Sequence, residues 1–231
     1  MKLNTFVERM NTYDLQLDRP KIMEDLRQLA TNRTLLSEYL YTSIQQDGFS
    51  TQNRLYGAYA FVLHSNDLFT VRLGFWSPVT SNDERETFIY DLNHSHDFEL
   101  YSVGYSGDGY TTVSREILDQ APLQAGRRPE FGEERVLKLI PGRVLHMIAL
   151  REVHKQLPPE TMSASLSLLI HPRQETKTEE AWCFDDNLVP TYPGIARQET
   201  ALFDSMLSRL QREQTSLPTQ SERKSVDQAT R

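Results

Sequence analysis

The chain has 231 residues, a formal net charge of −7 at pH 7 and one cysteine. Nonspecific binding to nucleic acid is excluded for a protein this acidic, because phosphates would repel it. The lone Cys183 excludes an intrachain disulfide and a metal site built from paired cysteines. No apolar run approaches the ~20 residues of a membrane span, and the N-terminus lacks the apolar core of a secretion signal. We therefore expect a cytoplasmic protein without a membrane or nucleic-acid partner.

Residues 1–48 carry apolar side chains at helical spacing. Three amphipathic stretches can be separated, and Arg19-Pro20 marks the break before the second. The apolar positions that define them are Phe6, Met10, Ile22, Leu26, Leu29, Leu35, Leu36 and Leu40. We predict an N-terminal helical segment over residues 1–48 that packs on the rest of the protein.

The pattern changes to short strands over residues 49–190. Residues 58–64 and 68–76 read as strands joined by a turn at Ser65-Asn66-Asp67. Further strands follow, separated by turns rich in Gly, Pro and Asp, and the stretches 77–87 and 119–132 read as loops. Many short strands without alternating helices are typical of a closed or two-sheet all-β domain.

The C-terminal part changes character again. Leu202, Phe203, Met206, Leu207 and Leu210 predict an amphipathic helix within residues 191–213. Residues 214–231 are rich in Ser, Thr, Gln and charge, with too little apolar surface to offset the entropy of ordering. We predict a disordered tail there.

The run from Asn93 to Leu100 contains two histidines spaced by one residue. On an extended strand His94 and His96 point to the same side, because side chains alternate with period two. The same side continues through Phe98 and Leu100, so two imidazoles are followed by apolar cover. Imidazole suits Zn, Cu, Fe and Ni. This run is therefore a candidate metal site.

These features resemble the cupin superfamily, and within it the three-histidine branch that includes the thiol dioxygenases. The resemblance covers roughly residues 55–172. In that family a His-x-His pair closes one strand, a Pro-Gly turn opens a second motif and a third His completes the metal site. The resemblance places the turn at Pro141-Gly142 and the third ligand at His154, with His146 as the alternative. It implies a double-stranded β-helix, or jelly-roll barrel, with N-terminal helices and a C-terminal helix.

Many cupins add a Glu four residues after the second His. Here that position is Leu100, and the nearest carboxylate, Glu99, falls on the opposite side of the strand by parity. The sequence therefore favours a site of three histidines without a carboxylate.

The substrate pocket departs from that of the thiol dioxygenases. The family's Tyr-x-Arg is Tyr59-Ala60-Phe61 here, with Phe in the Arg position, and this argues against cysteine itself as substrate. The resemblance implies a more apolar pocket with Phe61, Trp76, Phe98 and Leu100 as walls. Arg72 is the candidate for an anionic group of the substrate, with Arg143 and Arg151 as alternatives. Tyr105 is the candidate donor to a bound oxygen species, with Tyr101 and Tyr110 as alternatives.

The resemblance implies a mononuclear non-haem Fe(II) oxygenase that acts on a small organic substrate with O₂. One alternative is a redox-neutral isomerase, lyase or hydrolase that uses Zn, Ni or Mn. Another is a barrel that binds a small molecule without catalysis. Cupins often pair through strand edges, so a homodimer is compatible with the resemblance.

Overall fold

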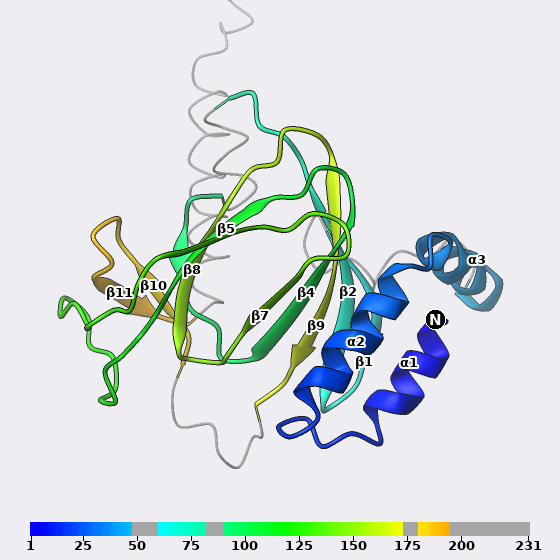
Figure 1. Cartoon of the computed structure of the whole chain (residues 1–231), viewed down its shortest axis with the longest axis horizontal. Coiled ribbons are helices and arrows are strands. Elements are labelled where there is room, and N and C mark those ends of the chain that lie inside the picture. The colour runs from blue at the N-terminus through cyan, green and yellow to red at the C-terminus, as the bar shows by residue number, and fades with distance from the viewer. Residues whose placement is uncertain (48–59, 82–89, 173–179, 195–231) are drawn as a thin grey trace, which may run out of the picture. The chain divides into compact units, whose positions relative to one another are not determined.

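The computed structural model describes residues 1–47, 60–81, 90–172 and 180–194 (Figure 1), and every structural statement below concerns these residues. Three helices open the chain: α1 (Leu3–Met10), α2 (Arg19–Ala30) and α3 (Leu35–Asp47). Pro20 stands in the first turn of α2, where a missing backbone N–H leaves no intrahelical bond unmade. The predicted N-terminal helices are confirmed.

Eleven strands form two antiparallel sheets in the described part of the chain. The five-stranded sheet has the order β1 (Ala60–Ser65), β2 (Phe69–Trp76), β9 (Ser163–Ile170), β4 (Glu99–Ser106) and β7 (Val144–Met147). The six-stranded sheet has the order β11 (Pro190–Pro193), β10 (Trp182–Phe184), β3 (Asn93–His94), β8 (Glu152–Leu157), β5 (Thr111–Glu116) and β6 (Arg135–Lys138). The prediction of a mainly β fold with two sheets, preceded by N-terminal helices, is confirmed.

The two faces of the five-stranded sheet pack against different parts of the protein, as the side chains of β9 show. Leu166 and Leu168 belong to a core formed with the apolar sides of the helices. By alternation Ser165, Ser167 and Leu169 face the other way, toward the six-stranded sheet. Figure 1 shows this layering, with α1 and α2, then β2, β4 and β9, then β5 and β8. We call the face toward the six-stranded sheet the inner face and the helix-covered face the outer face.

The Pro141-Gly142 turn joins β6 to β7 and packs against β4. Gly142 has φ of 81°, a left-handed conformation that Gly adopts without strain. Its N–H donates to the carbonyl of Gly104. A Cβ on Gly104 would meet the Ile140 carbonyl oxygen at 2.1 Å, so the close approach of this turn requires glycine in β4.

One predicted strand is divided between the two sheets. The sequence suggested a continuous extended run from His94 to Ser102, but β3 ends at His94 and β4 begins at Glu99 in the other sheet. Ser95 accounts for the end of pairing, because its backbone and side chain both bond to the backbone of Trp182. Residues 95–98 thus carry the chain across the interior.

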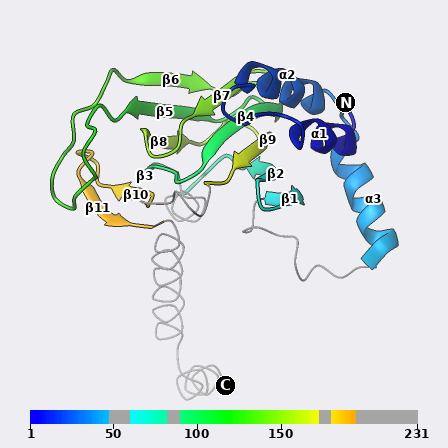
Figure 2. The same cartoon turned by 90° about the horizontal axis from the view of Figure 1, so that it is seen from below.

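The sheet extends further toward the C-terminus than predicted. Residues 191–193, which precede the apolar run that predicts the C-terminal helix, belong to β11, whose Tyr192 pairs with Cys183 of β10. Figure 2 shows these two strands at the end of the sheets far from α1 and α2. The rest of the predicted helix and the predicted tail lie outside the described residues. None of the described helices is long and apolar enough to cross a membrane.

Candidate metal centre

Three buried histidines converge on one point inside the protein. His94 lies on β3, His96 on the segment that leaves it and His154 on β8. The Nε2 atom of His96 is 3.2 Å from Nε2 of His94 and 3.2 Å from Nε2 of His154. All three candidate ligand atoms lie within 4.8 Å of one another. This is the group that the sequence predicted, with His154 as its third member.

Strand register brings the group together. His94 and His154 stand directly opposite each other on β3 and β8, so their side chains share the interior face of that sheet. His96 follows two residues later, where its carbonyl oxygen accepts a hydrogen bond of 2.7 Å from Leu150 N–H. Strand pairing therefore fixes the backbone at His94 and His154, and a backbone hydrogen bond fixes it at His96.

Burial keeps the three imidazoles neutral. Their exposed fractions are 8% for His94, 8% for His96 and 1% for His154. Loss of solvation lowers the pKa of His94, and it holds the pKa values of His96 and His154 well below the ordinary 6.5. Neutral imidazole is the form that binds a metal.

The outward ring nitrogens show how each ligand is oriented. His94 Nδ1 donates to the Leu92 carbonyl at 3.0 Å, which leaves the Nε2 lone pair directed into the group. Gln156 Nε2 lies 3.3 Å from His154 Nδ1, and with the amide turned by 180° its oxygen would instead accept a hydrogen bond from Nδ1–H. No described group hydrogen-bonds to His96 Nδ1. That ring is instead held by Phe98, which stacks on it with planes 15° apart.

The donor set and spacing fit a divalent metal ion. Nitrogens about 2.1 Å from a metal lie about 3.0 Å apart at a right angle and about 3.4 Å apart at the tetrahedral angle. The 3.2 Å separations fall between these values. One N–H of His96 could satisfy only one of its two neighbours, whereas a cation would satisfy all three lone pairs at once. The three histidines therefore form a group that could hold a metal ion.

Glu99 and His146 take no part in this group. Glu99 faces the helices, where its carboxylate accepts hydrogen bonds from Arg19 Nε at 2.8 Å, Tyr101 Oη at 2.6 Å and His146 Nε2 at 2.7 Å. Burial alone would raise the pKa of Glu99, but these three donors outweigh it and lower the pKa to about 2. Glu99 and the alternative third ligand His146 are therefore bonded to each other on the helix side of the sheet.

Several predicted pocket residues do face the interior. Trp76, Phe98 and Leu100 belong to an apolar cluster between the two sheets. Arg72 on β2 lies on the inner face, between Val71 and Leu73 of the helix-side core. Its positive charge contributes to the lowered pKa values of His94 and His96, after the larger effect of burial.

Two predicted site residues lie on the wrong face. Phe61 pairs with Leu73 and packs against Phe75 on the outer side of the sheet, so it cannot line a pocket at the histidines. Tyr105 also faces the helices, and its hydroxyl donates to the Asn32 carbonyl at 2.7 Å. Both predictions are wrong: the facing of Phe61 could not be read from the sequence, whereas Tyr105 shares the side of Glu99 on β4, which alternation turns away from the histidines.

The structure adds three interior residues that the sequence reasoning did not select as first choices. Tyr110 is buried beside Trp76, with ring centroids 3.9 Å apart. Gln156 could have been found from its spacing of two residues after His154 on one strand. Cys183 stands directly opposite His94 on β10, and no signal in the sequence indicated that pairing.

No protein-family model and no curated protein matches this sequence. Among solved structures, a DMSP lyase from Ruegeria pomeroyi is 14% identical with a TM-score of 0.31, over 54% of this chain and 55% of the lyase. A cupin superfamily protein from Desulfitobacterium hafniense is 12% identical with a TM-score of 0.29, over 49% of this chain and 76% of that one. A hydroquinone 1,2-dioxygenase solved with Cd²⁺ and 4-hydroxybenzonitrile is 15% identical with a TM-score of 0.30, over 48% of this chain and 63% of that one. The match thus spans about half the length of the lyase and less than two thirds of the dioxygenase.

Proposed function

We propose that this protein is a mononuclear non-haem Fe(II) enzyme that uses O₂ to oxidise a small organic anion. The observation that carries the proposal is the convergence of three buried, neutral imidazoles with no carboxylate among them. His94, His96 and His154 would hold the metal. Bound there, Fe(II) would keep its full charge and leave coordination positions for substrate and O₂.

The apolar surroundings favour oxidation over hydrolysis. Leu100, Leu145, Met147 and Leu169 are buried in the cluster between the sheets, and Phe98 covers His96. Such walls exclude water, which a hydrolase would need as a reactant and an oxygenase must keep from reactive groups.

Arg72 and Tyr110 supply the polar functions of the proposed site. Arg72 lies on the inner face of the sheet by strand alternation, and we assign it to the anionic group of the substrate. Burial raises the pKa of Tyr110 to about 12, so its hydroxyl stays protonated at neutral pH. Tyr110 Oη can therefore donate a hydrogen bond to a ligand between the sheets.

Metal analysis combined with O₂ consumption tests the proposal. Wild-type protein, a His94→Ala/His96→Ala variant and a His146→Gln variant would be loaded with Fe(II) without air and then freed of unbound metal. About one equivalent of iron is expected in the wild type and in His146→Gln, and none in the double variant. Exposure to O₂ with a panel of small carboxylates should then give uptake that depends on both substrate and iron.

The outcomes separate the candidate chemistries. Zinc, nickel or manganese in the isolated protein, with turnover of a substrate in the absence of O₂, would overturn the oxygenase assignment in favour of redox-neutral catalysis. Equal metal content in the wild type and the double variant would overturn the metal centre itself.

A further inference from the structure

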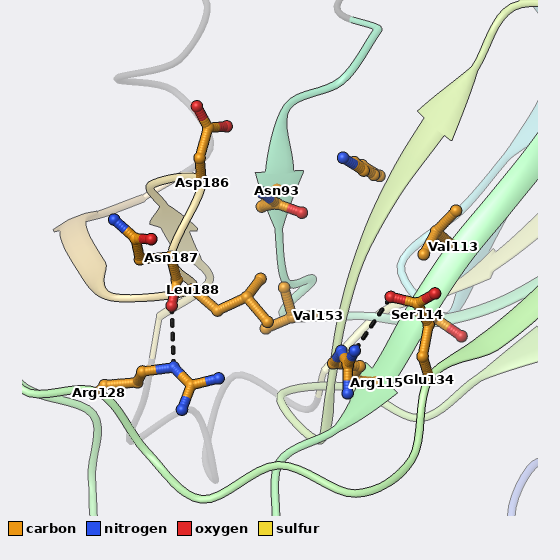
Figure 3. A pocket seen from close by; sticks show the side chains of 11 residues that line it. Asn93, Val113, Ser114, Arg115, Arg128, Glu134, Val153, Asp186, Asn187 and Leu188 are labelled. Atoms are coloured by element: carbon orange, nitrogen blue, oxygen red, sulfur yellow. Dashed lines mark hydrogen bonds and ion pairs between the residues drawn. The ribbon is translucent and has the colours of Figure 1, made fainter.

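A cleft of about 590 Å³ lies on the solvent side of the six-stranded sheet, away from the histidine group. Val153 and Lys155 line it from β8, and they flank His154 in the sequence. Because side chains alternate along a strand, these two point away from the interior into which His154 points. Figure 3 shows the cleft between β3, β5 and β8 and the segment that carries Asp186, Asn187 and Leu188.

Three cations from separate segments border this cleft, which we call the outer cleft. Arg115 comes from β5, Arg128 from the loop before β6 and Lys155 from β8. Two carboxylates, Glu134 and Asp186, also line it, so the cations are in excess although the whole chain carries a net charge of −7. A locally positive cleft on an acidic protein concentrates anions.

Two of these cations are held in place. Arg115 Nη2 pairs with Glu134 at 3.0 Å, and Arg128 Nε donates to the Asn187 carbonyl at 2.8 Å (Figure 3). The Arg128 guanidinium also lies over the Phe131 ring, 5.5 Å from its centroid. With Nε already engaged, the orientation of Arg128 is fixed while its Nη groups have no described hydrogen-bond partner. A guanidinium fixed in this way loses less entropy when it binds an anion.

The remaining wall of the outer cleft is apolar. Val113, Val153 and Leu188 contribute side chains to it. Leu188 has φ of 61°, an uncommon conformation for a non-glycine residue. The turn is held by Asp185, whose Oδ1 accepts the backbone N–H groups of Asn187 and Val189. The turn therefore presents an apolar side chain to the cleft at a definite position.

We propose that the outer cleft is a second binding site, specific for a small organic anion with an apolar body, such as an aryl carboxylate or an aryl phosphate. The volume lies within the range of small-molecule pockets, about 300–1,000 Å³. Arg128 and Lys155 bind the anionic group, and Val113, Val153 and Leu188 contact the apolar body. This site is separate from the metal centre and does not depend on the function proposed there.

Titrations of the full-length protein with phenyl phosphate and with benzoate test the site, with phenol as the neutral comparison. Binding is followed by chemical-shift changes and by calorimetry, for wild type, Arg128→Gln, Lys155→Gln and the control Arg127→Gln. Arg127 is exposed, adjacent in sequence and absent from the cleft lining. We expect saturable binding of at least one anion with a dissociation constant of about 1 mM or lower, and none for phenol.

The variants locate the bound anion. Each cleft substitution should weaken binding about tenfold or more, whereas Arg127→Gln and metal-free wild-type protein should bind as before. Preference between the two anions identifies a phosphate or a carboxylate ligand. No saturable binding of either anion, equal binding by all variants, or loss of binding only when the metal is removed would each overturn the proposal.

Discussion

The ring of Phe98 lies flat against the imidazole of His96, with centroids 4.5 Å apart and planes 15° apart. This contact matters because His96 is the ligand whose second ring nitrogen has no described hydrogen-bond partner. Its orientation therefore rests on stacking, whereas His94 is oriented by the Leu92 carbonyl. Ligands that are poorly oriented bind metal more weakly.

Replacement of Phe98 by Ala should weaken metal binding about tenfold or more. It should also lower the free energy of unfolding by about 1–3 kcal/mol, since the side chain is only partly buried. Phe61→Ala is the matched control, because Phe61 is also partly buried but lies on the outer face. A metal competition titration compares the two variants. Equal metal affinities would show that Phe98 does not orient His96.

Gln156 should orient His154 through its side-chain amide. For His154 Nε2 to bind a metal, its Nδ1 must carry the proton, and the amide oxygen of Gln156 must accept a hydrogen bond from Nδ1–H. Gln156→Leu is therefore expected to weaken metal binding about 10- to 100-fold. Gln156→Glu keeps an acceptor at this position and should retain or strengthen binding. Isothermal titration with Zn²⁺ or Fe(II) measures both, and indistinguishable affinities for the Leu and Glu variants would contradict this role.

Glu99 should contribute pH-dependent stability without contributing to metal binding. Its pKa is lowered from 4.5 to about 2 in the folded protein, so its stabilisation is present above about pH 4.5 and is lost as the pH falls toward 2. Because the carboxylate is largely buried, the contribution is roughly 2–3 kcal/mol. Glu99→Gln should remove it.

Urea denaturation of metal-free protein at several pH values checks this expectation. The difference between wild type and Glu99→Gln should be largest near neutral pH and shrink across the window from about 4.5 to about 2. Metal content at neutral pH should be the same in both proteins. A variant that loses its metal would show instead that Glu99 acts on the metal centre.

Strand geometry could predict that His94 and His96 lie together, whereas His154 entered as the third ligand only through the resemblance to cupins. Period-two alternation places His94 and His96 on one side and Glu99 on the other. The structure has the same arrangement, although the strand is interrupted between His94 and Glu99. Pairing between strands distant in sequence could not be predicted in this way. The contacts of Cys183 with His94 and of Ser114 with His154 depend on register, which no local pattern encodes.

The prediction of the sheet face on which the wall residues lie was wrong for a related reason. Both faces of the five-stranded sheet carry apolar side chains, because one face packs on helices and the other on the second sheet, although the inner face also carries Ser102, Ser165, Ser167 and Arg72. An apolar residue such as Phe61 then carries no sign of which core it belongs to. Tyr105 did carry a signal, because alternation along β4 places it on the side of Glu99, whereas the facing of Tyr110, just before β5, could not be read from the sequence.

The two tyrosines give the last prediction, which concerns catalysis. Tyr110 lies in the interior cluster next to Trp76, and its burial keeps the hydroxyl protonated with a pKa of about 12. Tyr105 is a matched control, since its hydroxyl donates to the Asn32 carbonyl on the helix side. Tyr110→Phe should lower kcat by about 10²-fold or more, if its hydrogen bond is made mainly to the transition state. Metal content should not change.

Tyr105→Phe should lower stability by about 1 kcal/mol through the lost hydrogen bond, with kcat and KM close to wild type. Steady-state O₂ uptake with the carboxylate that gives turnover, measured beside metal content, compares the two variants. A change in KM alone for Tyr110→Phe would limit its hydroxyl to substrate binding. Equal kcat losses in both variants would mean that Tyr110 acts only through the packing of the two sheets, since the two hydroxyls lie on opposite faces of the five-stranded sheet.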